Sequence, residues 1–202
     1  MQLYNAPAPN PRRVRIFLAE KGIDVPRVEV DIQGGETRSP QFLAKNKLAG
    51  TPIMELDDGE ILTESVAICR YLESLYPTPC LMGRSGLEAA RVEMWNRRME
   101  IEILGTYANV AQHSFDFFAD KIEQVPAFAE SQRRASAKKW AWLDSELADG
   151  RPFVGGADFS IADITGMAAL MVGDFAGIEI PKELNHVLAW SERMRERSSW
   201  DA

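Results

Sequence analysis

Hydrophobic and polar residues alternate in short runs through the first 76 positions of the chain. Leu3-Tyr4 and the alternating run 28–31 predict two short strands. Residues 53–62 predict a hairpin, because the step Asp58-Gly59 suits a tight turn between two strands. Strands that are separated by helices pair in parallel, whereas a hairpin adds antiparallel strands, so the pattern predicts a mixed sheet.

Three helices are predicted between and after these strands. The first has Asn10 at its N-cap and Pro11 at its first helical position, and Gly22 stands where a left-handed residue would end it. A short second helix begins at Ser39-Pro40 and ends near Asn46. The apolar stripe of the third helix consists of Ile68, Leu72 and Leu75. The predicted order is therefore β-α-β-α-β-β-α.

The pattern changes after the stiff segment Pro77-Thr78-Pro79, beyond which no strand is predicted and where all five tryptophans lie. Helical spacing predicts helices at about 87–118, at 127–147, from Ser160 onward and around 188–194. The third of these opens with Ser160 and Asp163 as a variant capping box, and it is apolar around most of its circumference, which is typical of a central helix. We predict an α/β domain at 1–76, a linker at 77–85 and an all-helical domain at 86–202.

Composition excludes several classes of function. A net charge of -7 argues against nucleic-acid binding, which needs a basic face, and the arginines at 12, 13 and 15 fall within one helix whose basic face we expect to be solvated. The two cysteines and two histidines have neither CxxC nor zinc-ligand spacing, so no metal is expected. No apolar stretch is long enough to span a membrane, and no signal sequence opens the chain. These features favour a cytoplasmic protein.

Three local motifs occur in one order along nearly the whole chain. They are Gly50-Thr51-Pro52-Ile53 before the hairpin, Leu62-Thr63-Glu64-Ser65 after it, and Phe159-Ser160-Ile161-Ala162-Asp163-Ile164 at the start of the central helix. Together they resemble the TxP segment, the Glu-Ser pair and the S-x-A-D motif of cytosolic glutathione transferases. The resemblance implies a thioredoxin-like N-terminal domain followed by a C-terminal helical bundle.

The resemblance also implies four glutathione-binding residues. Thr51 would present its backbone to the cysteine of glutathione, and Pro52 would follow a cis peptide bond; an ordinary trans turn is the alternative. An extended peptide is well held by main-chain pairing to a strand edge. Ser65 would receive the γ-glutamyl carboxylate at a helix N-terminus and Glu64 would face the γ-glutamyl amine. The alternative for this segment is simple capping of the helix by Thr63.

Activation of the glutathione thiol needs a group that stabilises the thiolate. Lowering a thiol pKa from about 8.5 by about 2 units needs roughly 2.7 kcal/mol of thiolate stabilisation. The first loop resembles a bacterial, nu-like class that carries a threonine followed two residues later by an asparagine. Here the threonine position holds Ala8, which leaves the Asn10 amide as the candidate donor; its alternative role is the N-cap. Tyr4 is a second candidate donor, unless it packs in the core.

The family resemblance places the second substrate, a small apolar electrophile, beside the long helix of the second half. Tyr107, His113 and Phe115 fall on this helix. The alternative, which we favour, is that Tyr107 and Phe115 belong to the interhelical core. Thr37 and Ala49 stand where related sequences often offer polar side chains to the glycine carboxylate of glutathione. These departures put tight glutathione binding in question.

A homodimer is expected from the family, with Trp95 and Met99 either as apolar anchors of the interface or as core of their own domain. The leading hypothesis is a glutathione transferase for detoxification of hydrophobic electrophiles, with glutathione as co-substrate and no metal. One alternative is glutathione-dependent reduction of disulfides or peroxides on the same fold. The other is a non-catalytic protein that binds glutathione or another ligand.

Overall fold

Four short strands form one mixed sheet in the computed structural model, which describes residues 1–202. The strand order is β2-β1-β3-β4, with β1 parallel to β2 and antiparallel to β3, and β3 antiparallel to β4. The elements of this half are β1 (Gln2–Asn5), α1 (Pro9–Lys21), β2 (Arg27–Glu29), η1 (Glu36–Arg38), α2 (Pro40–Lys45), β3 (Ile53–Glu55), β4 (Ile61–Thr63) and α3 (Ser65–Leu75). The predicted order and the mixed pairing are confirmed.

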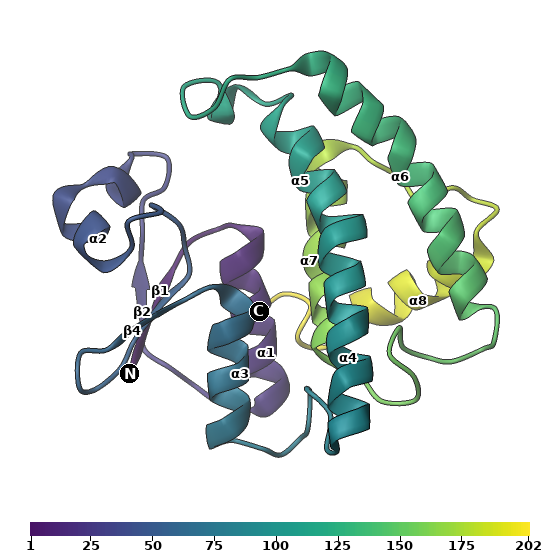
Figure 1. Cartoon of the computed structure of the whole chain (residues 1–202), viewed down its shortest axis with the longest axis horizontal. Helices are drawn as coiled ribbons and strands as arrows, with labels where there is room; N and C mark the ends of the chain where they lie inside the picture. Colours follow the sequence, from purple (N-terminus) through teal and green to yellow (C-terminus); the bar gives the residue numbers. More distant parts are fainter. The chain divides into compact units, whose positions relative to one another are not determined.

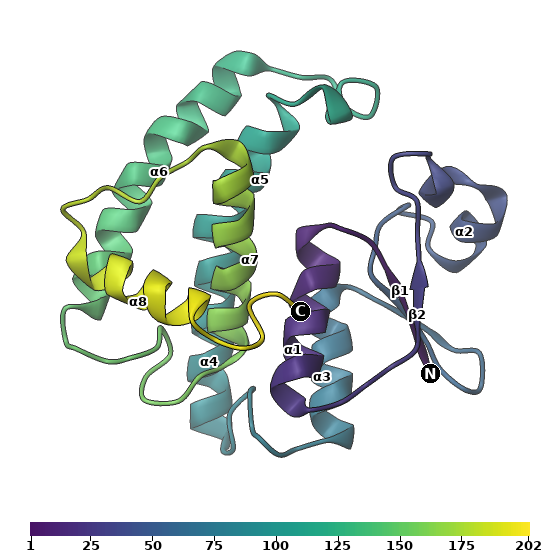
Figure 2. The ribbon, with the colours of Figure 1, turned by 180° about the vertical axis from the view of Figure 1, so that it is seen from behind.

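Helices cover both faces of this sheet. Figures 1 and 2 both show α1 and α3 side by side on one face of the sheet and α2 on the other. The fully buried side chains from the strands and from α1 and α3 include Leu3, Phe17, Ile53, Ile68 and Leu72. Burying such residues is the main favourable term that holds the sheet and its helices together.

A buried lysine ties the end of α1 to the segment after α3. Lys21 donates a hydrogen bond of 2.7 Å to the carbonyl of Tyr76 and another of 2.5 Å to that of Pro79. It also forms an ion pair of 2.5 Å with Glu73, and its side chain is fully buried. A buried ammonium must be paired to be tolerated, and these contacts compensate its charge.

The chain divides into two compact units, Met1–Leu81 with Asp201–Ala202, and Met82–Trp200. The second unit is helical throughout, apart from one isolated bridge, as predicted. Its elements are α4 (Gly86–Arg98), η2 (Met99–Leu104), α5 (Gly105–Gln112), η3 (Asp116–Phe118), α6 (Pro126–Leu147), α7 (Ile161–Ala176) and α8 (Asn185–Arg195). Figure 1 shows α4, η2 and α5 stacked end to end in one column.

The predicted helix at 87–118 is confirmed from residue 86 to residue 112, as α4, η2 and α5, and differs from the prediction in two respects. Its middle is a π-helical stretch, η2, and its helical turns end at Gln112. The side-chain amide of Gln124 donates to the carbonyls of Gln112 and Phe115 at 2.8 and 2.9 Å, and His113 Nδ1 accepts the N–H of Val125 at 3.0 Å. The loop after α5 therefore provides hydrogen bonds to backbone carbonyls that would have accepted hydrogen bonds within the helix if the helix were longer.

The central helix α7 begins with the predicted capping box, which is confirmed. The carboxylate of Asp163 accepts from the N–H groups of Val154 at 2.9 Å and Ser160 at 3.1 Å, and from the indole N–H of Trp190 at 3.0 Å. Asp163 is fully buried, and this burial raises the pKa of its carboxyl group. One side chain thus joins the start of α7 to the preceding loop and to α8.

No helix in the structure combines the length and the apolar character that crossing a membrane would require. The fold class predicted from the sequence, a four-stranded α/β half followed by an all-helical half, is confirmed.

Candidate functional site

Helix α3 begins with amide groups that nothing in the chain caps. Glu64 precedes the helix with φ 66° and ψ 113°, and no side chain caps the first turn, so the alternative of a Thr63 cap is wrong. A non-glycine residue at positive φ is strained and is found most often at functional sites. The free amides, together with the positive end of the helix dipole, form a site that attracts an anion.

Arg13 lies behind this helix start and contacts it directly. Its guanidinium Nη1 donates to Ser65 Oγ at 2.8 Å, and Arg13 and Ser65 are 1% and 4% exposed. The expectation that the basic face of α1 is solvated is therefore wrong for Arg13, because its side chain is buried against α3. Since Ser65 accepts from Arg13, its own hydroxyl proton remains available to a carboxylate.

The segment before β3 has an unusual backbone on both sides of Thr51. The Thr51–Pro52 peptide bond is cis, as predicted, and Ala49 has φ 54°. The main-chain N–H and C=O of Thr51 take no part in the turn and loop hydrogen bonds of this region. They are therefore open to an extended peptide, the mode of binding that main-chain groups next to a strand provide.

The start of α1 differs from the prediction. The helix begins at Pro9 with Ala8 as the N-cap, so Asn10 lies inside the first turn and is not the cap. The sequence offered two prolines that suit a first helical position, and the earlier one occupies it. Pro9 and Pro11 have no N–H, and the N–H of Arg12 bonds Ala8 at 3.1 Å. Asn10 is exposed. Its backbone N–H and its side-chain amide are therefore the open hydrogen-bond donors at this end of the helix.

Tyr4 is engaged elsewhere. Its hydroxyl donates to Glu55 Oε2 at 2.7 Å, and the same oxygen accepts from Lys45 Nζ at 2.7 Å. These hydrogen bonds, with one from Gln2, lower the pKa of Glu55 to about 2. Tyr4 is also half-buried against the core formed by Val30, Phe42 and Ile53, which agrees with the packing alternative and not with a role as thiol donor.

The buried cysteine of α3 is not a reactive thiol. Cys69 is fully buried, and burial raises the pKa of its thiol to about 12, so it stays protonated at neutral pH. No group of three or more His, Cys, Asp or Glu side chains is arranged to hold a metal ion.

The predicted residues of the helical half are mostly interior. Tyr107 is 1% exposed and its hydroxyl accepts a hydrogen bond from the indole N–H of Trp140. Trp95 and Met99 are 5% and 0% exposed within their own unit, and Trp95 stacks on Trp142 at 6.0 Å. Of the two alternatives for Trp95 and Met99, interface anchor or core of their own domain, the structure supports the domain core.

Comparisons with known proteins decide the family. The profile of the glutathione S-transferase N-terminal domain matches residues 3–80. Glutathione S-transferase 2 of Saccharomyces cerevisiae is 36% identical over 204 residues, which cover 98% of this chain and 87% of the relative. The chain belongs to the glutathione S-transferase family.

Solved structures agree with this assignment. A glutathione S-transferase domain-containing protein of Marinobacter aquaeolei is 38% identical, with a TM-score of 0.94 and coverage of 99% of this chain and 100% of that one. Human glutathione transferase theta-2, solved with glutathione and an unknown ligand, is 27% identical, with a TM-score of 0.85 and coverage of 98% and 82%.

Three features of the site could not be predicted from the sequence. Ala49 and Glu64 adopt left-handed backbone conformations that neither residue type signals, since only glycine and asparagine indicate such positions. Arg13 looks like one more charged residue of a solvated helix face. Its pairing with Ser65 joins positions far apart in the sequence, and no local pattern reports it.

Proposed function

We propose that the protein is a glutathione transferase that conjugates the glutathione thiolate to small hydrophobic electrophiles. The observation that carries the proposal is the uncapped start of α3, where the Ser65 hydroxyl is held by a buried arginine and keeps its proton for an anion. Membership of the family and the transferase names of its full-length relatives support the same activity.

Glutathione would lie as an extended peptide between two parts of the first unit. The γ-glutamyl carboxylate would accept from Ser65 and the first amides of α3, while Glu64 would bind the γ-glutamyl amine. Thr51, next to Pro52, would pair its main chain with the cysteine of glutathione. Support comes from the open main-chain groups of Thr51 and from the left-handed Glu64, which turns the chain at the helix start.

The thiolate would be stabilised by Asn10 at the N-terminus of α1. The prolines on both sides of Asn10 have no N–H, so its backbone and side-chain amides are the donors at this helix end. A hydrogen bond to a charged group contributes about 1.5–3 kcal/mol, close to the roughly 2.7 kcal/mol that a shift of 2 units requires. Ala8 adds nothing to this stabilisation, and the relation of this loop to a nu-like class stays a prediction.

The electrophile would bind to aromatic rings of the helical unit. Tyr107 was the predicted wall of this pocket, but its side chain is only 1% exposed and offers little surface to an apolar electrophile. Phe115 and Phe175 pack ring to ring at 4.7 Å, and Phe175 is 70% exposed. Exposed aromatic side chains of this kind are typical of sites that bind apolar ligands. We therefore favour Phe115 and Phe175.

We further propose that the enzyme is a homodimer that contacts its partner through α4. Leu87 and Met94 are 63% and 41% exposed and lie seven residues apart, so they fall within about 20° of each other around the helix. Ile101, 53% exposed, follows after another seven residues in η2. Such an exposed apolar row is uncommon on a monomer. We therefore expect this row, and not the buried Trp95 and Met99, to form the apolar part of the dimer interface. A reducing cytoplasm suits the two free cysteines.

Binding and turnover measurements on the purified protein test the proposed activity. Calorimetry with glutathione should detect binding, and a titration of thiolate absorbance should show that the bound thiol has a pKa below its free value of about 8.5. Turnover of an aryl halide would then support conjugation. Turnover of a disulfide without the aryl halide would favour the reductase alternative. Binding with an unshifted thiol pKa would leave a ligand-binding role only, and no binding at millimolar glutathione would refute both enzyme hypotheses.

A further inference from the structure

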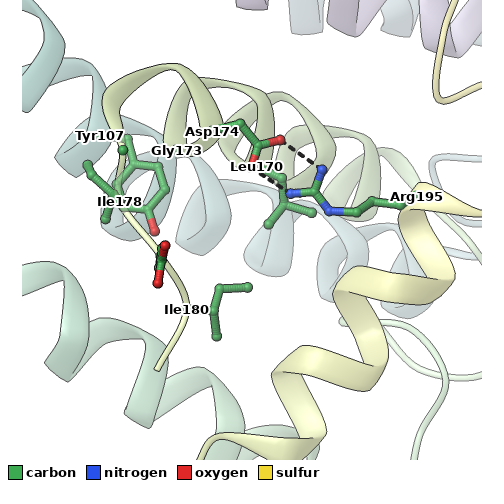
Figure 3. Close-up of a pocket in the computed structure, with 9 residues that line it drawn as sticks. Tyr107, Leu170, Gly173, Asp174, Ile178, Ile180 and Arg195 are labelled. Atoms are coloured by element: carbon green, nitrogen blue, oxygen red, sulfur yellow. Dashed lines mark hydrogen bonds and ion pairs between the residues drawn. The ribbon is translucent and has the colours of Figure 1, made fainter. Parts of the chain in front are cut away.

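A separate cavity of about 440 Å³ lies within the helical unit, between α5, α7, α8 and the segment after α7. Figure 3 shows Tyr107, Asp174, Ile180 and Arg195 around it, with the Tyr107 hydroxyl directed into the space. Its volume is within the range of small-molecule sites. None of the residues proposed for glutathione lines it.

Tyr107 supplies an unused donor to this cavity. Its oxygen accepts from the Trp140 indole N–H, and both side chains are buried, so the oxygen is fixed in place. No side chain or carbonyl of the chain accepts the phenolic proton. Burial raises the pKa of Tyr107, which keeps that proton on the oxygen. A buried donor without an acceptor is costly, so an acceptor from a ligand would be favoured.

The fold holds the Tyr107 ring against α7 at a glycine. A Cβ at Gly173 would come within 2.6 Å of the Tyr107 ring, so only glycine allows the ring to lie there. Gly173 and Tyr107 both line the cavity, so this contact forms part of its wall.

The charged groups on the wall leave one carboxylate without a partner. Asp174 forms two hydrogen bonds of 2.7 Å with Arg195, so these charges compensate each other. Arg133 donates to the carbonyls of Ala176 and Gly177 at the end of α7. Glu179 also lines the cavity and is exposed, and it makes no ion pair. The wall therefore combines one open anion with one open donor.

We propose that this cavity binds a small organic amine that carries a carbonyl oxygen and a short apolar group. The ammonium would pair with Glu179, the carbonyl would accept from Tyr107, and the apolar group would pack on Leu170 and Ile180. Amino-acid amides have this combination of groups. A free amino acid would add a carboxylate, which Glu179 and the paired Asp174 would repel.

Leucinamide is a suitable probe, and the indole N–H signal of Trp140 is the readout, because Trp140 bonds the tyrosine oxygen. In a ¹H–¹⁵N titration of the full chain, leucinamide should shift this signal saturably, with a Kd on the order of 1 mM for a ligand of this size. Isoamylamine, which lacks the carbonyl, and 4-methylpentanamide, which lacks the ammonium, should each bind about tenfold more weakly.

Paired variants separate the site from general charge effects. Glu179→Gln should weaken leucinamide binding about tenfold, whereas Glu183→Gln, which removes the same charge from an exposed residue outside the cavity, should leave it unchanged. Tyr107→Phe should abolish the difference between leucinamide and isoamylamine. The proposal fails if no saturable shift appears, or if both glutamate variants weaken binding equally. The proposed amide site lies only in the helical unit, so the outcome of this titration does not depend on whether the protein binds glutathione.

Discussion

Arg13 in α1 donates a hydrogen bond of 2.8 Å to the hydroxyl of Ser65, the first residue of α3. Both residues are buried, so the arginine charge lies close to the uncapped amides of this helix start. In the proposed site, a fixed positive charge, a hydroxyl proton and free amides would act on the same carboxylate.

Removal of the Ser65 hydroxyl should weaken glutathione binding. Ser65→Ala is expected to cost about 1 to 2 kcal/mol of binding free energy, as for loss of a hydrogen bond to a charged group. Calorimetry with glutathione measures the change. Ser74→Ala, at an exposed serine of the same helix, is the matched control and should have no effect. Unchanged affinity in Ser65→Ala would show that the carboxylate binds elsewhere.

Asn10 should control the acidity of the bound thiol more than the affinity for glutathione. In Asn10→Ala the pKa of bound glutathione should rise by about 1 unit, because one hydrogen bond to the thiolate is lost. Thiolate absorbance against pH measures this shift, and the pH profile of turnover should move in the same direction. Asn10→Ser keeps a donor and should restore part of the effect. Since Asn10 is exposed and is not the N-cap, neither variant should change stability.

The order of elements could be predicted because each depends on local patterning. Alternation at 28–31 and the capping pair Ser160 and Asp163 are read from neighbouring residues, and both correspond to observed elements. The end of α5 at Gln112 could not be predicted in this way. It depends on Gln124, a side chain twelve positions away that satisfies the last carbonyls.

Residues of the candidate site could be predicted where a sequence motif implies the backbone conformation. They could not be predicted where contacts between distant parts of the chain determine the surroundings of a side chain. Thr51–Pro52 and Ser65 follow from motifs of the family. Arg13 was expected to be solvated, because helical periodicity gives the direction of a side chain but not the groups that surround it. Asn10 was assigned to the N-cap because the prolines on both sides of it, Pro9 and Pro11, each suit the first helical position.

The exposed row on α4 predicts the behaviour of interface variants. Leu87→Glu combined with Met94→Glu would place charges in an apolar contact, so the protein should change from dimer to monomer. Sedimentation equilibrium or light scattering after gel filtration measures the mass. Phe175→Glu, which alters a side chain of 70% exposure on another helix, should remain dimeric. A wild-type monomer, or a double variant that stays dimeric, would contradict the proposed interface.

Glu55 should make the first unit sensitive to acid. Hydrogen bonds from Lys45, Tyr4 and Gln2 hold its folded-state pKa at about 2, below the ordinary value of 4.5. Because the folded pKa is the lower one, these contacts stabilise the fold fully above about pH 4.5, and the stabilisation is lost as the pH falls toward 2. Urea unfolding at pH 7 and pH 3 should therefore show a smaller loss of stability in Glu55→Gln than in the wild type. Glu60→Gln, at an exposed residue of the hairpin, should behave like the wild type, and an equal acid response in all three proteins would show that this network does not contribute.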